Sequence, residues 1–314
     1  MSQSGSREAE HEITISAPAA AVYQLIAEVV NWPRIYPPTV HVDQVEAGER
    51  EERIRIWATA NGEFKAWTSR RTLDPEALRI TFRQEVPSPP VASMTGTWII
   101  EALSENESRV RLLHEFRAVG DDPDGLQWID EAVDRNSRSE LAGLKQNVEL
   151  AHESEEITFS FQDTVQIDGS AKDVYGYIND AHLWPERLPH VDSVQLTEES
   201  PGLQSLEMVT RAANGSTHAT RSFRVCFPDR RIAYKQVTMP ALMTLHTGCW
   251  TFEENDQGVA ATSQHTVVLN TENITRILGA GATVADSRKH VQEALSTNSR
   301  ATLAHAKDYA ERRR

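Results

Sequence analysis

A serine and an arginine two residues apart occur twice in segments with strand character, at Ser69 and Arg71 and again at Ser222 and Arg224. In the first segment, a period of two places Trp67, Ser69 and Arg71 on one face of the strand. If that face is internal, an always-charged guanidinium lies in an enclosed space, where its donors suit a developing enolate or alkoxide oxygen. The alternative is that this face meets water, because single arginines in strands are mostly exposed.

A histidine recurs on the inward side of a later strand. His114 shares its parity with Leu112 and Phe116, and His265 shares its parity with Val267. Both side chains are therefore expected to point into the protein. Each is either a hydrogen-bonded core residue or a group that shuttles a proton.

Other polar side chains interrupt apolar segments. Asn136 and Asn298 each interrupt the apolar stripe of a long helix, where a buried amide needs an internal partner or a ligand. Tyr36 follows the first helix, and its phenol either packs or relays a proton. The matching place in the second half holds Leu188, which suggests that the two halves do different work.

The chain contains a long internal repeat. Val22-Tyr23 and Trp32-Pro33 recur 152 positions later as Val174-Tyr175 and Trp184-Pro185. A period of this length indicates a duplicated domain rather than a solenoid unit, and 314 residues suit two domains. We therefore expect domains at residues 1–152 and 157–314, joined by a charged linker.

Each repeat is predicted to run strand, helix, several strands, long helix. In the first repeat, hydrophobic periodicity and turn residues predict strands at 12–15, 53–57, 64–72, 78–86, 94–102 and 109–118. A helix is predicted over residues 19–30, ended by Asn31-Trp32-Pro33, and an amphipathic helix is predicted after Asp122-Pro123. The second repeat has a strand at 159–167, a helix at 171–181, strands to about 269 and a helix from about 284 to 309. The fold class is therefore α+β, with an antiparallel sheet wrapped around a long C-terminal helix in each domain.

Charge and composition exclude several classes of function. A net charge of −14 disfavours nucleic-acid and anionic-membrane partners. No apolar run is long enough to span a membrane, and the N-terminus lacks a secretion signal, so we expect a cytoplasmic protein. No nucleotide loop, zinc pattern or nucleophile elbow is present, which predicts chemistry without a cofactor or metal.

The ordered motifs resemble those of a known family. Trp67-x-Ser69-x-Arg71, then Met94-x-Gly96-x-Trp98, then Arg135-Asn136-Ser137 resemble the aromatase/cyclases of bacterial type II polyketide synthases, and the repeat resembles their didomain branch. The resemblance implies tandem helix-grip (START/Bet v 1-like) domains, each with a deep pocket between sheet and helix. It also implies a poly-β-ketone substrate carried by acyl carrier protein and already ketoreduced. Other synthase components would be further partners, and the reaction would be C7–C12 ring closure, dehydration and aromatisation.

The resemblance assigns roles to particular residues. Arg71 would polarise a ketone or enolate oxygen, Ser69 would orient it or a water, and Tyr36 would exchange a proton, with His114 as a candidate shuttle. The side chains expected to shape the cavity and contact the chain are Trp32, Trp67, Met94, Trp98 and Asn136. The second pocket would use Ser222, Arg224, His246, Trp250, His265 and Asn298.

The second half departs from the family pattern. Thr220 stands in place of Trp67, Leu188 in place of Tyr36, and His246 in place of Met94. The full set occurs in the first half alone, so we expect the main cyclisation site there. The second cavity would assist dehydration or brace the first domain. The rival hypothesis is a non-catalytic carrier of a lipid or aromatic ligand, since the same fold also binds such molecules without reacting.

Overall fold

The computed structural model describes residues 5–149, 156–211, 215 and 217–313. Its contacts divide the chain into two compact units, Met1–His152 and Glu153–Arg314. The predicted domain boundary falls largely at residues 150–155, outside the described residues.

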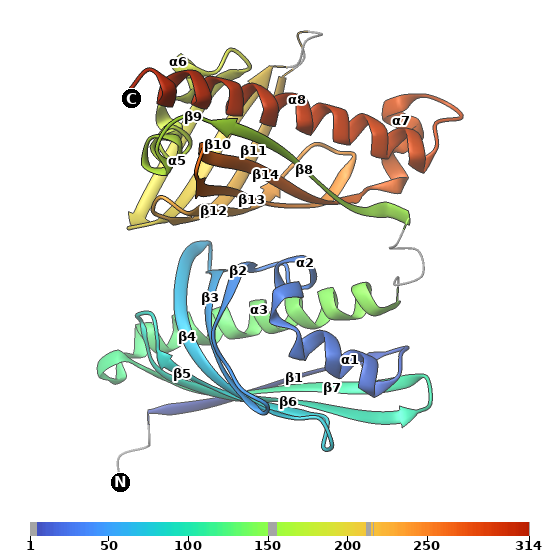
Figure 1. Ribbon diagram of the computed structural model, residues 1–314. Helices are drawn as coiled ribbons and strands as arrows, with labels where there is room; N and C mark the ends of the chain where they lie inside the picture. Colours follow the sequence, from blue (N-terminus) through green and yellow to red (C-terminus); the bar gives the residue numbers. More distant parts are fainter. Residues whose placement is uncertain (1–4, 150–155, 212–214, 216, 314) are drawn as a thin grey trace. The chain divides into compact units, whose positions relative to one another are not determined.

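Within residues 5–149, seven strands form one antiparallel sheet in the order β1-β7-β6-β5-β4-β3-β2. The strands are β1 (Ser6–Ile15), β2 (Thr39–Ala47), β3 (Glu51–Ala60), β4 (Glu63–Asp74), β5 (Arg79–Val86), β6 (Val91–Ser104) and β7 (Glu107–Ala118). The helices are α1 (Ala19–Ala27), α2 (Trp32–Ile35) and α3 (Pro123–Glu149), with short 3₁₀ turns at Val29–Asn31 and Val119–Asp121. Figure 1 shows this sheet curling around α3.

The apolar stripe of α3 explains why the sheet curls around it. Ile129, Val133 and Leu144 lie on one side of the helix and are buried, as their spacing predicts. Leu112 and Phe116 supply part of the opposing face of the sheet, because alternate residues of β7 point inward. Burying that stripe requires a concave apolar surface, which the curved sheet provides.

The C-terminal unit repeats the arrangement. Over residues 156–211, 215 and 217–313, seven antiparallel strands follow the order β8-β14-β13-β12-β11-β10-β9. The strands are β8 (Thr158–Ile167), β9 (Val191–Ser200), β10 (Leu203–Arg211), β11 (Thr217–Phe227), β12 (Arg231–Thr238), β13 (Met243–Asn255) and β14 (Gly258–Leu269). The helices are α5 (Ala171–Asn179), α6 (Trp184–Arg187), α7 (Ile274–Leu278) and α8 (Val284–Glu311), with 3₁₀ turns at Ala181–Leu183 and Thr271–Asn273. Thr283 and Asp286 form a capping box that begins α8.

The predicted fold class is confirmed, with differences at particular elements. The edge strand β2 (Thr39–Ala47) was not predicted, because it pairs on one side and carries few inward apolar residues. The first helix ends at Ala27 rather than at Val30, and Trp32-Pro33 begins a new helical turn instead of ending one. Proline is tolerated there because a helix's first turn needs no donor from it. No described helix is long and apolar enough to cross a membrane.

Candidate active site

Arg71 lies inside the N-terminal domain, with 2% of its surface exposed. Its Nε lies 3.2 Å from Oε1 of Glu52 on the neighbouring strand. Its Nη2 donates to the carbonyl oxygens of Ile26 and Ala27, each at 3.2 Å, and its guanidinium stacks 4.9 Å from the centre of the Trp32 ring. The water-exposed alternative is therefore wrong. Among the described residues, nothing accepts a hydrogen bond from Arg71 Nη1.

The guanidinium borders an inner cavity of about 90 Å³. An outer cavity of about 110 Å³ lies next to it, toward α3 and the loop before β6. The inner cavity is lined by residues that include Trp32, Tyr36, Ser69, Arg71 and Trp98. The outer one is lined by residues that include Ser88, Pro89, Val91, Trp128 and Asn136. Trp67, Gln84, Met94, His114 and Glu140 line both. The proline-containing segment before β6 thus forms part of a cavity wall.

Tyr36 lies at the end of α2 and is held between two indoles. Its ring meets Trp32 edge-on at 5.3 Å and stacks with Trp98 at 6.0 Å. Burial raises the pKa of Tyr36 well above its usual value, and the nearby Glu140 raises it further. The phenol therefore stays protonated and faces the cavity as a donor.

Glu140 of α3 is a cavity residue that the sequence analysis missed. Burial raises the pKa of its carboxyl to about 8, so it is mostly protonated at neutral pH. A carboxyl with such a pKa can donate a proton and recover it, which suits general acid–base chemistry. A carboxyl pKa shifted this far is typical of a functional site, and no residue spacing in the sequence indicates it.

His114 points inward, as its parity predicts, and meets the edge of Phe82 at a centroid distance of 5.5 Å. Burial lowers its pKa to about 4, so the ring is neutral. In the described part of the domain, its Nδ1 has no hydrogen-bond partner. The Asn136 amide has an internal partner, because its Nδ2 donates to the Thr59 carbonyl oxygen at 2.9 Å.

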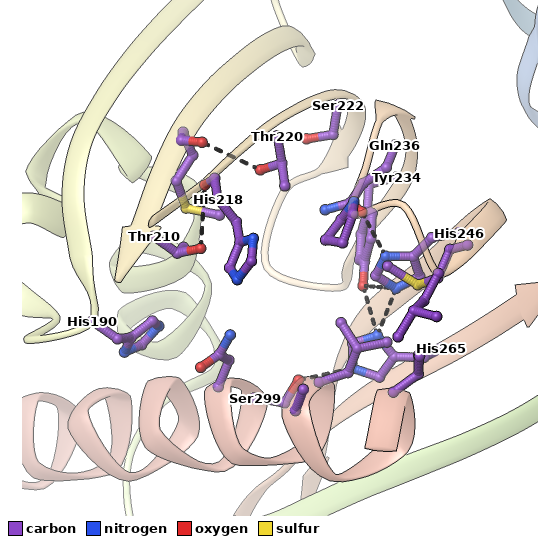
Figure 2. A pocket seen from close by; sticks show the side chains of 18 of the residues that line it. His190, Thr210, His218, Thr220, Ser222, Tyr234, Gln236, His246, His265 and Ser299 are labelled. Atoms are coloured by element: carbon purple, nitrogen blue, oxygen red, sulfur yellow. Dashed lines mark hydrogen bonds between the residues drawn. The ribbon is translucent and has the colours of Figure 1, made fainter. Parts of the chain in front are cut away.

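The C-terminal domain encloses a much larger cavity, of about 500 Å³. Its lining includes all six residues predicted for this pocket, Ser222, Arg224, His246, Trp250, His265 and Asn298, together with Thr220 and Tyr234. Figure 2 shows His246 and His265 adjacent to each other, and His190 and His218 across the cavity from them. Asn298 lines the cavity from α8 but is exposed rather than buried, so the expectation of a buried amide was wrong.

Arg224 repeats the burial of Arg71 but not its ion pair. It is 3% exposed, its Nη2 donates to the Ile178 carbonyl oxygen at 2.8 Å, and it lies 5.4 Å from the centre of the Trp184 ring. The residue opposite it on β10 is Gln204, in the place that Glu52 holds in the first domain. Within the described residues, no carboxylate comes within ion-pair distance of Arg224.

The two inward histidines of this cavity contact each other. His246 Nε2 lies 2.9 Å from His265 Nδ1, and His265 Nε2 lies 2.8 Å from Ser299 Oγ. Burial lowers the pKa of His246 to about 3 and that of His265 to about 4. Both rings are therefore neutral. In the described part of the chain, no third histidine, cysteine or carboxylate joins them to form a metal-binding group.

Comparison with known proteins gives the family. Residues 6–149 and 158–311 each match the family described as "Polyketide cyclase / dehydrase and lipid transport". The chain belongs to this family.

Relatives align with this cyclase over nearly its whole length. It is 54% identical to the granaticin polyketide synthase bifunctional cyclase/dehydratase of Streptomyces virginiae, covering 95% of this chain and 98% of that protein. It is 45% identical to the corresponding actinorhodin protein of Streptomyces coelicolor, covering 98% of each. The crystal structure of the di-domain ARO/CYC BexL from the BE-7585A biosynthetic pathway is 66% identical, with a TM-score of 0.86 and coverage of 97% and 99%. The chain is a two-domain polyketide cyclase/dehydratase.

The cyclase gathers the predicted residues into distinct sites. The nine predicted N-terminal residues line the inner cavity, the outer cavity or both. The residues that sequence reasoning missed are Glu140, Glu52 and Tyr234. The signal for Tyr234 was present in the repeat, since it stands 152 positions after Phe82. Glu52 needed the strand register, which places it opposite Arg71.

Proposed function

We propose that this enzyme binds a ketoreduced poly-β-ketone carried by acyl carrier protein. It closes the first ring between C7 and C12, removes water and aromatises the ring. It acts without a cofactor, in the cytoplasm, beside the other components of a type II polyketide synthase. The names of the full-length relatives support the reaction class, and the buried Arg71 at the wall of the N-terminal cavities carries the assignment of the site.

Ring closure requires an enol carbon to attack a ketone held close to it. The indoles of Trp32, Trp67 and Trp98 give the cavity rigid walls that restrict how a flexible chain folds, and holding two reacting groups together is worth several kcal/mol. Arg71 Nη1 can donate a hydrogen bond to the ketone oxygen and polarise it. Because Glu52 balances its charge, Arg71 acts on this oxygen mainly through that hydrogen bond.

The oxygen of the attacked ketone becomes an alkoxide as the carbon–carbon bond forms. Tyr36 and Glu140 are protonated donors near the same cavity, and either can supply the proton that turns the alkoxide into a hydroxyl. Ser69, buried beside Arg71, orients the oxygen or a water. The chemistry then needs a second step, because the hydroxyl must leave before the ring becomes aromatic.

The test is the product profile of a reconstituted type II synthase supplied with Arg71→Ala. We expect spontaneously cyclised shunt products in place of the correctly closed ring, while Arg138→Ala, at an exposed arginine of α3, leaves the profile unchanged. Arg71→Lys keeps the positive charge but loses the planar set of guanidinium donors, so it should be little more active than Arg71→Ala. An unchanged profile with Arg71→Ala, together with a lipid or aromatic ligand retained in native mass spectra, would instead indicate a carrier.

A further inference from the structure

The C-terminal cavity contains a continuous hydrogen-bonded chain of polar side chains. Gln236 Oε1 lies 2.8 Å from His246 Nδ1, His246 Nε2 lies 2.9 Å from His265 Nδ1, and His265 Nε2 lies 2.8 Å from Ser299 Oγ. The Tyr234 hydroxyl lies beside the central bond, 3.0 Å from His265 Nδ1 and 3.5 Å from His246 Nε2. The dashed lines in Figure 2 follow this chain.

The chain has a fixed direction. The amide oxygen of Gln236 can only accept, so His246 Nδ1 carries a proton and His246 Nε2 is an acceptor. His265 Nδ1 must then donate to His246, which leaves His265 Nε2 to accept from Ser299. Each neutral ring thus has one protonated nitrogen, which donates, and one unprotonated nitrogen, which accepts. A proton added at one end can be passed along without turning a ring over.

The first domain lacks this chain at the matching places. Phe82, Gly96 and His114 are cross-strand neighbours there, as Tyr234, Gly248 and His265 are here. The first copy has Phe82 where the second has Tyr234, and Met94 where the second has His246. These two differences convert a solitary neutral histidine into a linked Tyr–His–His group.

The buried arginines of the two domains, Arg71 and Arg224, also differ in their charged surroundings. In the first domain a buried carboxylate neutralises Arg71, whereas Gln204 stands opposite Arg224 and carries no charge. Among described residues, nothing accepts a hydrogen bond from Arg224 Nη1, which is buried. Glu198, which accepts a hydrogen bond from Gln204 at 2.7 Å, and Asp180 act on Arg224 through charge at longer range, without a direct ion pair. A buried guanidinium without a directly paired carboxylate stabilises an anion more strongly than a paired one does. The second cavity is therefore the one suited to an enolate.

We propose that the C-terminal cavity is the dehydration site, in which Arg224 holds an enolate oxygen and the Tyr234–His265–His246 group moves the proton. The substrate is the ring that carries a hydroxyl β to a ketone. This inference rests on the proposed function, since it needs the closed ring as its substrate. It assigns the two chemical steps to different cavities of one chain.

The step balances with no other reactant. The histidine pair takes the proton from the carbon between ketone and carbinol, and the C–H electrons form an enolate whose oxygen lies against Arg224. The enolate then re-forms the ketone, a C=C bond forms, and the C–O bond of the carbinol breaks. Tyr234 delivers the same proton to the departing hydroxyl, and water leaves. The low basicity of both rings favours prompt return of the proton.

The cavity volumes of the two domains agree with this assignment of the two chemical steps. A cavity of about 500 Å³ has room for a closed ring with the rest of the chain attached, within the range that small-molecule sites span. The inner and outer cavities of the first domain, of about 90 and 110 Å³, share lining residues and are each much smaller than this.

The experiment uses the full chain in a reconstituted synthase and follows intermediates by mass spectrometry over time. The variants His246→Met and Tyr234→Phe give the second cavity the residues that the first domain already accommodates. His265→Gln is a further variant, and His182→Met at an exposed histidine of the same domain is the control. We expect elimination of water to slow about 100-fold in the cavity variants. An intermediate heavier by one water, with the first ring correctly closed, then accumulates.

The outcomes separate the two proposals. Wild-type rates of water loss in His246→Met and His265→Gln, while Arg71→Ala still diverts the product, would overturn this inference and leave the proposed function standing. Loss of correct ring closure in the histidine variants would also overturn it, because the cavity would then serve cyclisation. If Arg71→Ala has no effect either, the proposed function itself fails. Circular dichroism melting of each variant shows whether it is folded.

Discussion

Glu52 faces Arg71 across the β3–β4 pair, and the two side chains form an ion pair that is almost completely buried. Gln44 donates to the other carboxylate oxygen of Glu52 at 2.6 Å, which holds the carboxylate in place. The pair fixes the guanidinium at the cavity wall and balances its charge there.

Glu52→Gln should destabilise the N-terminal domain, because it leaves a buried cation without its partner. We expect a loss of about 3 kcal/mol in the free energy of unfolding, measured by calorimetry of the full chain. The matched control is Glu76→Gln, which breaks the exposed pair with Arg50 and should cost less than about 1 kcal/mol. Equal costs for the two variants would mean that the buried pair contributes no more than a surface one.

Tyr36→Phe should slow ring closure while leaving the fold intact. The ring contacts with Trp32 and Trp98 remain, and only the proton donor is lost. We expect a reduction on the order of 100-fold in single-turnover ring closure. Tyr23→Phe, at a buried tyrosine of α1, is the control and should keep the wild-type rate. A Tyr36→Phe enzyme at full rate would leave Glu140 as the sole donor.

Glu140→Gln should remove a pH dependence of stability. Folding raises the pKa of this carboxyl from 4.5 to about 8, so the native state binds the extra proton between those values and stability falls as pH rises through them. A pKa change of one corresponds to about 1.4 kcal/mol, and Glu140 is partly exposed, so we expect wild-type stability to fall by about 2 kcal/mol from pH 5 to pH 8.

The measurement is urea unfolding of wild type and Glu140→Gln across that range. Tyr36, Arg71 and His114 line the same cavity, and of these His114 titrates near pH 4, below the window. A difference between the two proteins that stays constant from pH 5 to pH 8 would show that Glu140 is not the group responsible.

Gly248→Ala should displace Tyr234 from the histidine pair. A Cβ at this position would lie 2.3 Å from the Tyr234 hydroxyl oxygen and 2.6 Å from the Gln264 carbonyl oxygen, so the ring must move. Overpacking of this kind costs about 1–3 kcal/mol, and we expect slower dehydration as well. Gly176→Ala, in the open middle of α5, should instead stabilise the chain by about 0.5–1 kcal/mol. Comparing the melting temperatures of the two alanine variants tests the prediction.

The sequence predicts the fold well because the repeat and the strand alternation are strong signals. Parity alone placed His114 inside. For Ser69 and Arg71 it left an internal and a water-facing alternative open, and the structure shows both side chains buried. The partner of Arg71 could not be found in that way. Glu52 lies in a charged run, and only the β3–β4 register reveals which of its carboxylates turns inward.

The long helices set a different limit on what the sequence reveals. Glu140 occupies a helix position that resembles a solvated surface site, because acidic residues are abundant in this chain and its neighbours are polar. Asn298 shows the opposite error, since its spacing predicts a buried side chain whereas the side chain is exposed at the cavity. The stripe of a long helix tells which side faces the sheet. It does not tell where the sheet stops covering it.

Each domain has its own apolar core, one built around residues such as Ile26 and Leu144 and the other around residues such as Ile178 and Leu303. A change in the lining of one cavity therefore leaves the packing that folds the other untouched. The repeat thus gives the chain two cavities of the same fold whose side chains differ at matching places, as Met94 and His246 do. Under the proposed division of steps, hybrid enzymes become a rational goal, with the ring selectivity of one parent joined to the C-terminal half of another.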